Sequence, residues 1–129
     1  MLATELPEPL ATLAARLQER GFAVDEQPPS ESFGDRLITF ADERLSVRLT
    51  RDRSQWTIEL GHPTWEDVYD PDVWRAALEG ADPTEPSELE EQAAYVAGAL
   101  DTLREAAGDP GLQERLDEIA IARADLWFG

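Results

Sequence analysis

The chain has 129 residues, 42% of them hydrophobic, which is enough for one domain with a core of its own. Its formal net charge is −17, from 28 acids against eleven cations, and every cation is an arginine. This acidity argues against DNA or RNA as a direct ligand, because phosphates would be repelled, and favours basic protein partners or simply solubility. The absence of cysteine excludes disulfides, thiolate catalysis and cysteine-based metal centres.

Neither a membrane span nor a signal peptide is expected. No run of about 18 apolar residues occurs. The first ten residues, MLATELPEPL, have acids where a secretory signal peptide needs cations. We therefore expect a cytoplasmic protein without membrane contact.

The first predicted element is an amphipathic helix, because leucines recur at spacings of four, three and four: Leu6, Leu10, Leu13 and Leu17. Thr4 is a suitable N-cap, and Gly21 suits a left-handed stop. A short strand is predicted over residues 22–26. The two prolines of the next segment, QPPSES, exclude helix and central strand there.

Three more strands are predicted over residues 36–41, 44–50 and 54–60, from alternating apolar and polar side chains. In the last of them, Trp56, Ile58 and Leu60 share one face. The connections between these strands are too short for a helical crossover. The sequence therefore predicts an antiparallel meander of three or four strands.

A short helix follows the irregular stretch that contains His62. Asp70 is its expected cap, Pro71 occupies its first position, where an amide is not needed, and Gly80 ends it. Residues 80–86, with two prolines and a glycine, are the clearest linker in the chain.

Beyond the linker, Ser87 and Glu90 have the spacing of a capping box at the start of a helix of about five turns. The sequence AAGDPG ends this helix, and Asp109 is the expected cap of a last one. Two helices joined by so short a turn should pair antiparallel. The predicted fold is therefore α+β, with an α+β domain at residues 1–79 and a C-terminal helical hairpin at 87–129. This hairpin either packs on the domain or forms a homodimer.

Charge is segregated along the chain. Residues 36–53 contain five arginines and three acids, whereas residues 59–91 contain eleven acids and one arginine. The tip of the second hairpin holds a charge cluster: Arg48, Arg51, Asp52 and Arg53. Two interpretations remain open. The arginines pair with acids of neighbouring helices, or they form a partner-binding surface together with the acids of residues 59–91.

Aromatic and acidic residues alternate after the last strand. Tryptophan and tyrosine dominate interface hot spots, and carboxylates suit a basic partner. The candidate partner-binding residues are therefore Trp65, Glu66, Asp67, Tyr69, Asp70, Asp72 and Trp74, with the three aromatic residues as anchors.

The stretch VRLTRDRSQWTIELG, followed by WEDVYDPDV, resembles a set of small uncharacterised bacterial proteins. In those proteins an R-D-R-G-Q-W hairpin precedes a short aromatic and acidic helix, and Ser54 stands where they usually have glycine. The resemblance covers about residues 10–79. Such small acidic α/β proteins are similar to the immunity proteins that neutralise bacterial toxins, which implies a binding role and assigns no catalytic residue.

Catalytic and metal-binding motifs are weak. His62 with Glu66 and the following aspartates is a set that can hold a divalent cation, but Pro63 interrupts it. No glycine-rich phosphate loop appears. We therefore expect no catalytic residue, no metal site and no cofactor. The favoured hypothesis is a non-enzymatic acidic module that binds a basic protein, as an immunity protein or antitoxin does. The alternatives are a homodimeric adaptor domain and a metal-dependent hydrolase.

Overall fold

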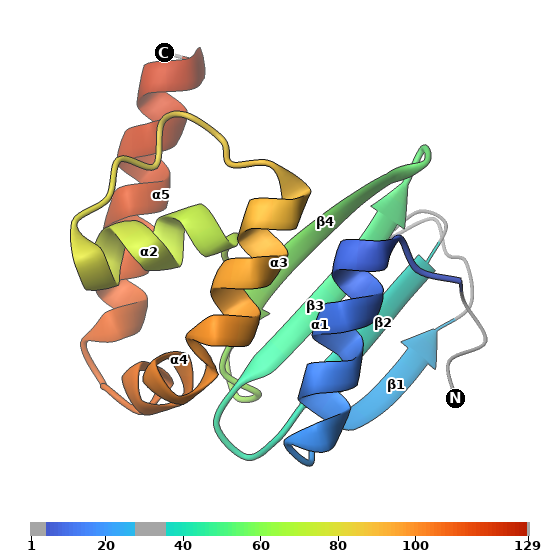
Figure 1. Ribbon diagram of the computed structural model, residues 1–129. Coiled ribbons are helices and arrows are strands. Elements are labelled where there is room, and N and C mark those ends of the chain that lie inside the picture. Colours follow the sequence, from blue (N-terminus) through green and yellow to red (C-terminus); the bar gives the residue numbers. More distant parts are fainter. Residues whose placement is uncertain (1–4, 28–35, 129) are drawn as a thin grey trace.

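The computed structural model describes residues 5–27 and 36–128, which form an α+β protein (Figure 1). The predicted fold class is confirmed, since an N-terminal helix precedes a four-stranded antiparallel sheet and further helices. The elements are α1 (Glu8–Glu19), β1 (Ala23–Gln27), β2 (Arg36–Ala41), β3 (Ser46–Asp52), β4 (Gln55–Gly61), α2 (Pro71–Glu79), α3 (Leu89–Gly98), α4 (Leu100–Ala107) and α5 (Leu112–Phe128). Within these described ranges, no helix is long and apolar enough to cross a membrane.

The sheet is a meander with the strand order β1-β2-β3-β4, and every neighbouring pair is antiparallel. Side-chain alternation separates its faces, and the inner face is fully buried under helices: Ile38, Phe40, Val47, Leu49, Ile58 and Leu60. β3 begins two residues later than predicted. The Asp42 carboxylate accepts hydrogen bonds from the amides of Arg44 and Leu45, both at 2.8 Å, and holds that connection as a turn.

The hairpin between β3 and β4 has a two-residue loop. Asp52 faces Gln55 in the strand register, which leaves Arg53 and Ser54 as the loop. Both have positive φ angles, 53° and 67°. Positive φ at both central positions is the geometry of a type I′ turn, whose twist matches that of the flanking strands.

Helices α1 and α3 lie side by side across the inner face of the sheet (Figure 1). The predicted apolar face of α1 supplies Leu10, Leu13 and Leu17 to a single core that also contains Ala93 and Val96 of α3. The helix begins after Pro7, while its predicted cap, Thr4, lies outside the described residues. Gly21 has a φ of 87°, as expected for the residue after a helix.

The C-terminal helices differ from the expected hairpin in two respects. The first helix is broken at Ala99 into α3 and α4, and Gly98, a poor helix former, precedes the break. The break directs Leu100 and Leu103 into the core. In addition, α3 packs mainly on α1, whereas α5 packs mainly on α2 (Figure 1).

The predicted capping box is also wrong. The N-cap of α3 is Glu88, which makes no side-chain capping bond. The amide of Ser87 donates instead to the Asp72 carboxylate at 3.0 Å. A contact across the linker therefore replaces the local cap.

Residues 80–86 connect α2 to α3 without helix or strand, and they do not separate two cores. Leu112 and Leu116 of α5 belong to the same hydrophobic cluster as the α1 leucines and the inner face of the sheet. The region after the linker is therefore packed on the sheet.

Candidate protein-binding site

The predicted aromatic anchors lie where β4 ends. Trp74 is 0% exposed and Tyr69 is 7% exposed, so the expectation that they act as surface anchors is wrong. Trp74 donates from Nε1 to the carbonyl oxygen of Leu60 at 3.1 Å. Its ring stacks on half-buried Trp65 with centroids 5.9 Å apart. These rings complete the core, because a large apolar surface is more stable there than in water.

The same aromatic group closes the end of the β4 edge. Leu60 and Tyr69 exchange two backbone hydrogen bonds, of 2.8 and 2.9 Å. Gly61 permits this return of the chain, because a Cβ there would lie 3.1 Å from the Cγ1 of Val68. The Tyr69 hydroxyl donates to Asp117 of α5. Burial, together with that carboxylate, raises the pKa of Tyr69 above its ordinary value.

Asp70 is occupied by contacts within the chain. As predicted, it caps α2, accepting from the amide of Val73 at 3.2 Å. It also accepts two hydrogen bonds from Arg123 of α5, at 3.1 and 2.5 Å. The Arg123 side chain is only 13% exposed, and its guanidinium lies 4.5 Å from the ring centroid of Trp127. This bidentate pair fastens α5 to the start of α2.

Sequence reasoning missed the role of Arg123. The only local signal is its spacing from Trp127, because residues four apart share a face of a helix. Its partner Asp70 lies 53 positions earlier in the chain. Only the tertiary fold brings these residues together.

The predicted acids divide into two groups. Glu66 and Asp67 are exposed, in the loop between β4 and α2. Asp72 is 9% exposed and accepts from the Ser87 amide and from Gln92 Nε2 at 3.2 Å, so it joins α2 to α3. Among the predicted acids of this loop and helix, only the first group is free to face a partner.

The predicted hairpin charge cluster is dispersed. Arg48 lies on the outer face of the sheet, opposite Glu59 of β4. Arg51 belongs to the inner-face row and lies over the Trp56 ring, 5.7 Å from its centroid. Asp52 and Arg53 are exposed at the hairpin tip. These residues therefore do not form one continuous patch.

The charged form of the Glu59 carboxyl, opposite Arg48 on the outer face of the sheet, is disfavoured. Burial raises its pKa, and this effect exceeds the attraction of Arg48, which lowers it. The charge of Asp70 raises it further. The folded state therefore favours the protonated form of Glu59, mainly because the side chain is partly buried.

A cavity of about 290 Å³ borders the part of β4 that Tyr69 does not cover. Its walls come from β4, the start of α2, the linker end with the start of α3, and α5: Trp56, Thr57, Ile58, Asp70, Asp72, Pro86, Ser87, Leu89, Gln92, Arg123 and Trp127. Pockets for drug-sized ligands usually measure about 300–1,000 Å³. This cavity lies at the lower limit of that range and has room for a protein side chain.

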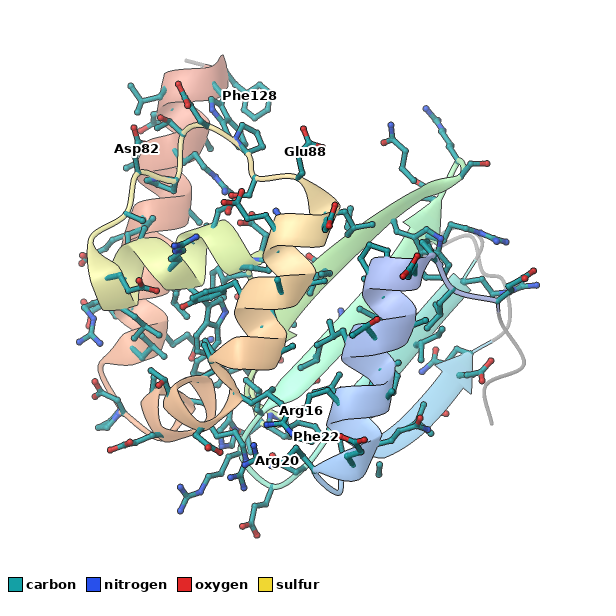
Figure 2. All side chains as sticks on the ribbon, viewed as in Figure 1. Arg16, Arg20, Phe22, Asp82, Glu88 and Phe128 are labelled. Carbon is teal, nitrogen blue, oxygen red and sulfur yellow. The ribbon has the colours of Figure 1, made fainter. Side chains whose placement is uncertain are left out.

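Exposed acids lie on the segment that supplies Pro86, Ser87 and Leu89 to the cavity wall. The linker and the start of α3 carry five of them: Asp82, Glu85, Glu88, Glu90 and Glu91. Residues 81–99 contain no cation. Figure 2 shows Asp82 and Glu88 on this segment and Phe128 at the end of α5, all at the same end of the molecule. Residues 81–91, named here the acidic segment, supply Pro86, Ser87 and Leu89 to the cavity wall, whereas Glu90 lines a separate pocket against α1.

The imidazole of His62 is held by hydrogen bonds with Thr64, two residues later in a turn. Its Nδ1 accepts from the amide of Thr64 at 3.1 Å and lies 2.8 Å from the hydroxyl of the same residue. In the described part of the chain, no group of three or more His, Asp or Glu side chains could hold a metal ion. No ligand set there supports the hydrolase hypothesis.

Comparisons with protein-family models, with curated proteins and with solved structures gave no match. The resemblance to immunity proteins therefore stays a prediction. The function has to be argued from the cavity beside β4 and from the acids around it.

Proposed function

We propose that this chain is a non-enzymatic acidic protein that binds and neutralises a basic partner in the cytoplasm, in the manner of an immunity protein or antitoxin. The observation that supports this proposal is the acidic segment, residues 81–91, which contains no cation and borders a cavity of side-chain size. A positively charged side chain entering the cavity would be attracted by this border. The aromatic and aliphatic walls would then exclude water around it.

The arginines do not offset this field, because many of them are used inside the molecule. Ion pairs in the described ranges join Arg16 to Glu19, Arg20 to Asp101, Arg75 to Glu79, Arg104 to Asp42, Arg115 to Asp109, and Arg123 to Asp70. The acids that remain exposed leave the surface strongly negative. Such a field accelerates encounter with a basic partner, and salt weakens it.

The proposal is tested by capture with the immobilised chain from a bacterial lysate, at low and at high salt. We expect a basic protein that is retained at low salt and released as the salt concentration rises. The partner should also lose its own activity when bound. The double variant Glu85→Gln/Glu88→Gln should capture it at least about tenfold less strongly, which corresponds to about 1.4 kcal/mol.

A matched variant separates a local effect from net charge. Glu114→Gln/Glu118→Gln removes two exposed acids from α5, away from the cavity lining, and should leave capture nearly unchanged. Equal losses in both variants would show attraction to net charge alone. Capture of no basic protein at either salt concentration would contradict the proposal.

A homodimer through the C-terminal helices is a second candidate. It is favoured by exposed apolar side chains on α5, of which Phe128 is 86% and Leu126 is 73% exposed. Sedimentation velocity over a range of protein concentrations tests it. A monomer at every concentration would exclude this candidate.

A further inference from the structure

The outer edge of β4 has one paired half and one unpaired half. Because Leu60 bonds to Tyr69 with both its amide and its carbonyl, its backbone polar groups point away from β3. Backbone direction alternates along a strand, so the amides and carbonyls of Trp56 and Ile58 point the same way. The two-residue loop leads to the same conclusion. Gln55 is in the hydrogen-bonded pair that closes the hairpin, so its amide and carbonyl point toward β3 and those of the next residue, Trp56, point away from it.

These outward groups have no backbone partner within residues 5–27 and 36–128. An unpaired strand edge is a template for another strand, because main-chain hydrogen bonds supply affinity whatever the sequence of the added segment. The cavity lies directly along this edge, since Trp56, Thr57 and Ile58 all line it.

The surroundings of the edge specify the charge of an occupant. In the cavity wall Asp70 and Arg123 form an ion pair and offset each other, so Asp72 is left as the uncompensated charge there. The exposed acids Glu85 and Glu88 adjoin the wall residues Pro86 and Ser87 in the chain and add to this negative charge. Alternate side chains of an added strand would point to the same side of the sheet as Trp56 and Ile58, where the cavity opens. A basic side chain at every second position would fit this arrangement.

We infer that β4 binds an extended basic segment of the partner as a fifth strand of the sheet, along Trp56 to Ile58. This inference rests on the proposed function and specifies its mode of binding. A second copy of this chain is a poorer occupant of this edge, because pairing β4 with β4 would bring the acidic segments of the two copies together.

The probe is a peptide of about ten residues with alternating arginine and threonine. Its binding is followed by fluorescence anisotropy, and residue-resolved amide exchange is followed by NMR. In the complex, the amides of Trp56 and Ile58 should become at least about tenfold more protected, because they gain hydrogen-bond partners. The amides of Thr57 and Glu59 already face β3 and serve as internal controls.

A second peptide, N-methylated at alternate residues on the edge that faces β4, keeps the charge and removes the donors. It should bind at least about tenfold more weakly. A weaker affinity in Glu85→Gln/Glu88→Gln, and not in Glu114→Gln/Glu118→Gln, would assign the charge recognition to the acidic segment.

The outcomes separate the two proposals. If both peptides bind equally and the exchange of Trp56 and Ile58 is unchanged, strand addition is wrong, whereas salt-dependent capture of a whole basic protein would still support the proposed function. Failure of the alternating peptide to bind also overturns strand addition. Protection of the two amides that grows with protein concentration in the absence of peptide would assign the edge to a second copy.

Discussion

One half of the β4 edge is paired with the returning chain, and the other half is unpaired and faces a cavity. At the Leu60 end, the chain turns back and pairs with the strand, and Trp74 donates to the same carbonyl that accepts from Tyr69. At the Trp56 end, the edge faces a cavity bordered by acids. The strand itself is alike at both ends, because apolar side chains alternate throughout. The difference comes from the segment that returns to the edge, which shows how one strand can contribute to the core and to a binding surface.

The largest expected effect concerns the paired end. Trp74→Ala should lower the free energy of unfolding by about 3–5 kcal/mol, because it empties a fully buried site and leaves the Leu60 carbonyl without its indole donor. Urea denaturation measures this loss. Trp74→Phe, which keeps most of the ring and removes the donor, should cost less.

Trp127→Ala is the control at the cavity. Trp127 is 42% exposed and donates to the Thr84 carbonyl at 3.0 Å, so its loss should cost about 1 kcal/mol. A similar loss of unfolding free energy in both variants would contradict the distinction between the paired Leu60 end of β4, which belongs to the core, and the Trp56 end, which faces the cavity.

The elements that the sequence predicted well are governed by local rules. The presence of a hairpin between β3 and β4, the Asp70 cap with Pro71, and the glycine after α2 each follow from residues within a few positions of one another. The predicted hairpin connection, residues 51–53, is wrong in register, because Arg51 and Asp52 belong to β3 and the loop is Arg53 and Ser54. Gly80 adopts a φ of 74°, a conformation that glycine adopts without strain. Alternation also assigned the inner face of β4 correctly, because one face of a packed sheet must be apolar.

The elements that were predicted poorly from the sequence depend on contacts between distant segments. The break at Ala99 comes with the burial of Leu100 and Leu103 in the shared core, and the burial of Trp74 depends on the return of the chain at Gly61. For the site, the acids of residues 81–91 were visible in the sequence, whereas the cavity that they border is not. It needs α5, which reaches β4 only in the folded chain.

A smaller effect concerns Glu59, whose side chain lies on the outer face of β4, between Ile58 and Leu60 in the strand. Its raised pKa means that the folded state favours the protonated carboxyl. The corresponding stability is present below the ordinary glutamate pKa of about 4.3 and is lost as the pH rises through the higher folded value. Glu59→Gln should therefore stabilise the protein at neutral pH by at most about 1 kcal/mol, because partial exposure screens the charge.

The gain should disappear as the pH falls below about 4.3, where the wild-type carboxyl is protonated as well. Urea denaturation of both proteins at several pH values measures the difference. Asp42→Asn is the opposite control. Burial raises the Asp42 pKa, but the Arg44 and Leu45 amides and Arg104 outweigh that effect and leave it lowered. Its stabilisation is therefore present at neutral pH and lost in acid. A Glu59→Gln gain that did not depend on pH would point to packing instead of charge.

The smallest expected effect concerns the turn that holds the open end of β4. Ser54 has a φ of 67°, which a side chain with a Cβ adopts with strain and glycine adopts freely. Ser54→Gly should raise the free energy of unfolding by about 0.5 kcal/mol, since relief of strain exceeds the extra entropy of glycine in the unfolded chain. Ser54→Ala retains the Cβ and should give no gain. If alanine stabilised the protein as much as glycine, the effect would come from the lost hydroxyl and the turn would not be strained. The affinity for the alternating peptide should stay unchanged in Ser54→Gly, because the substitution preserves the register that directs Trp56 and Ile58 outward.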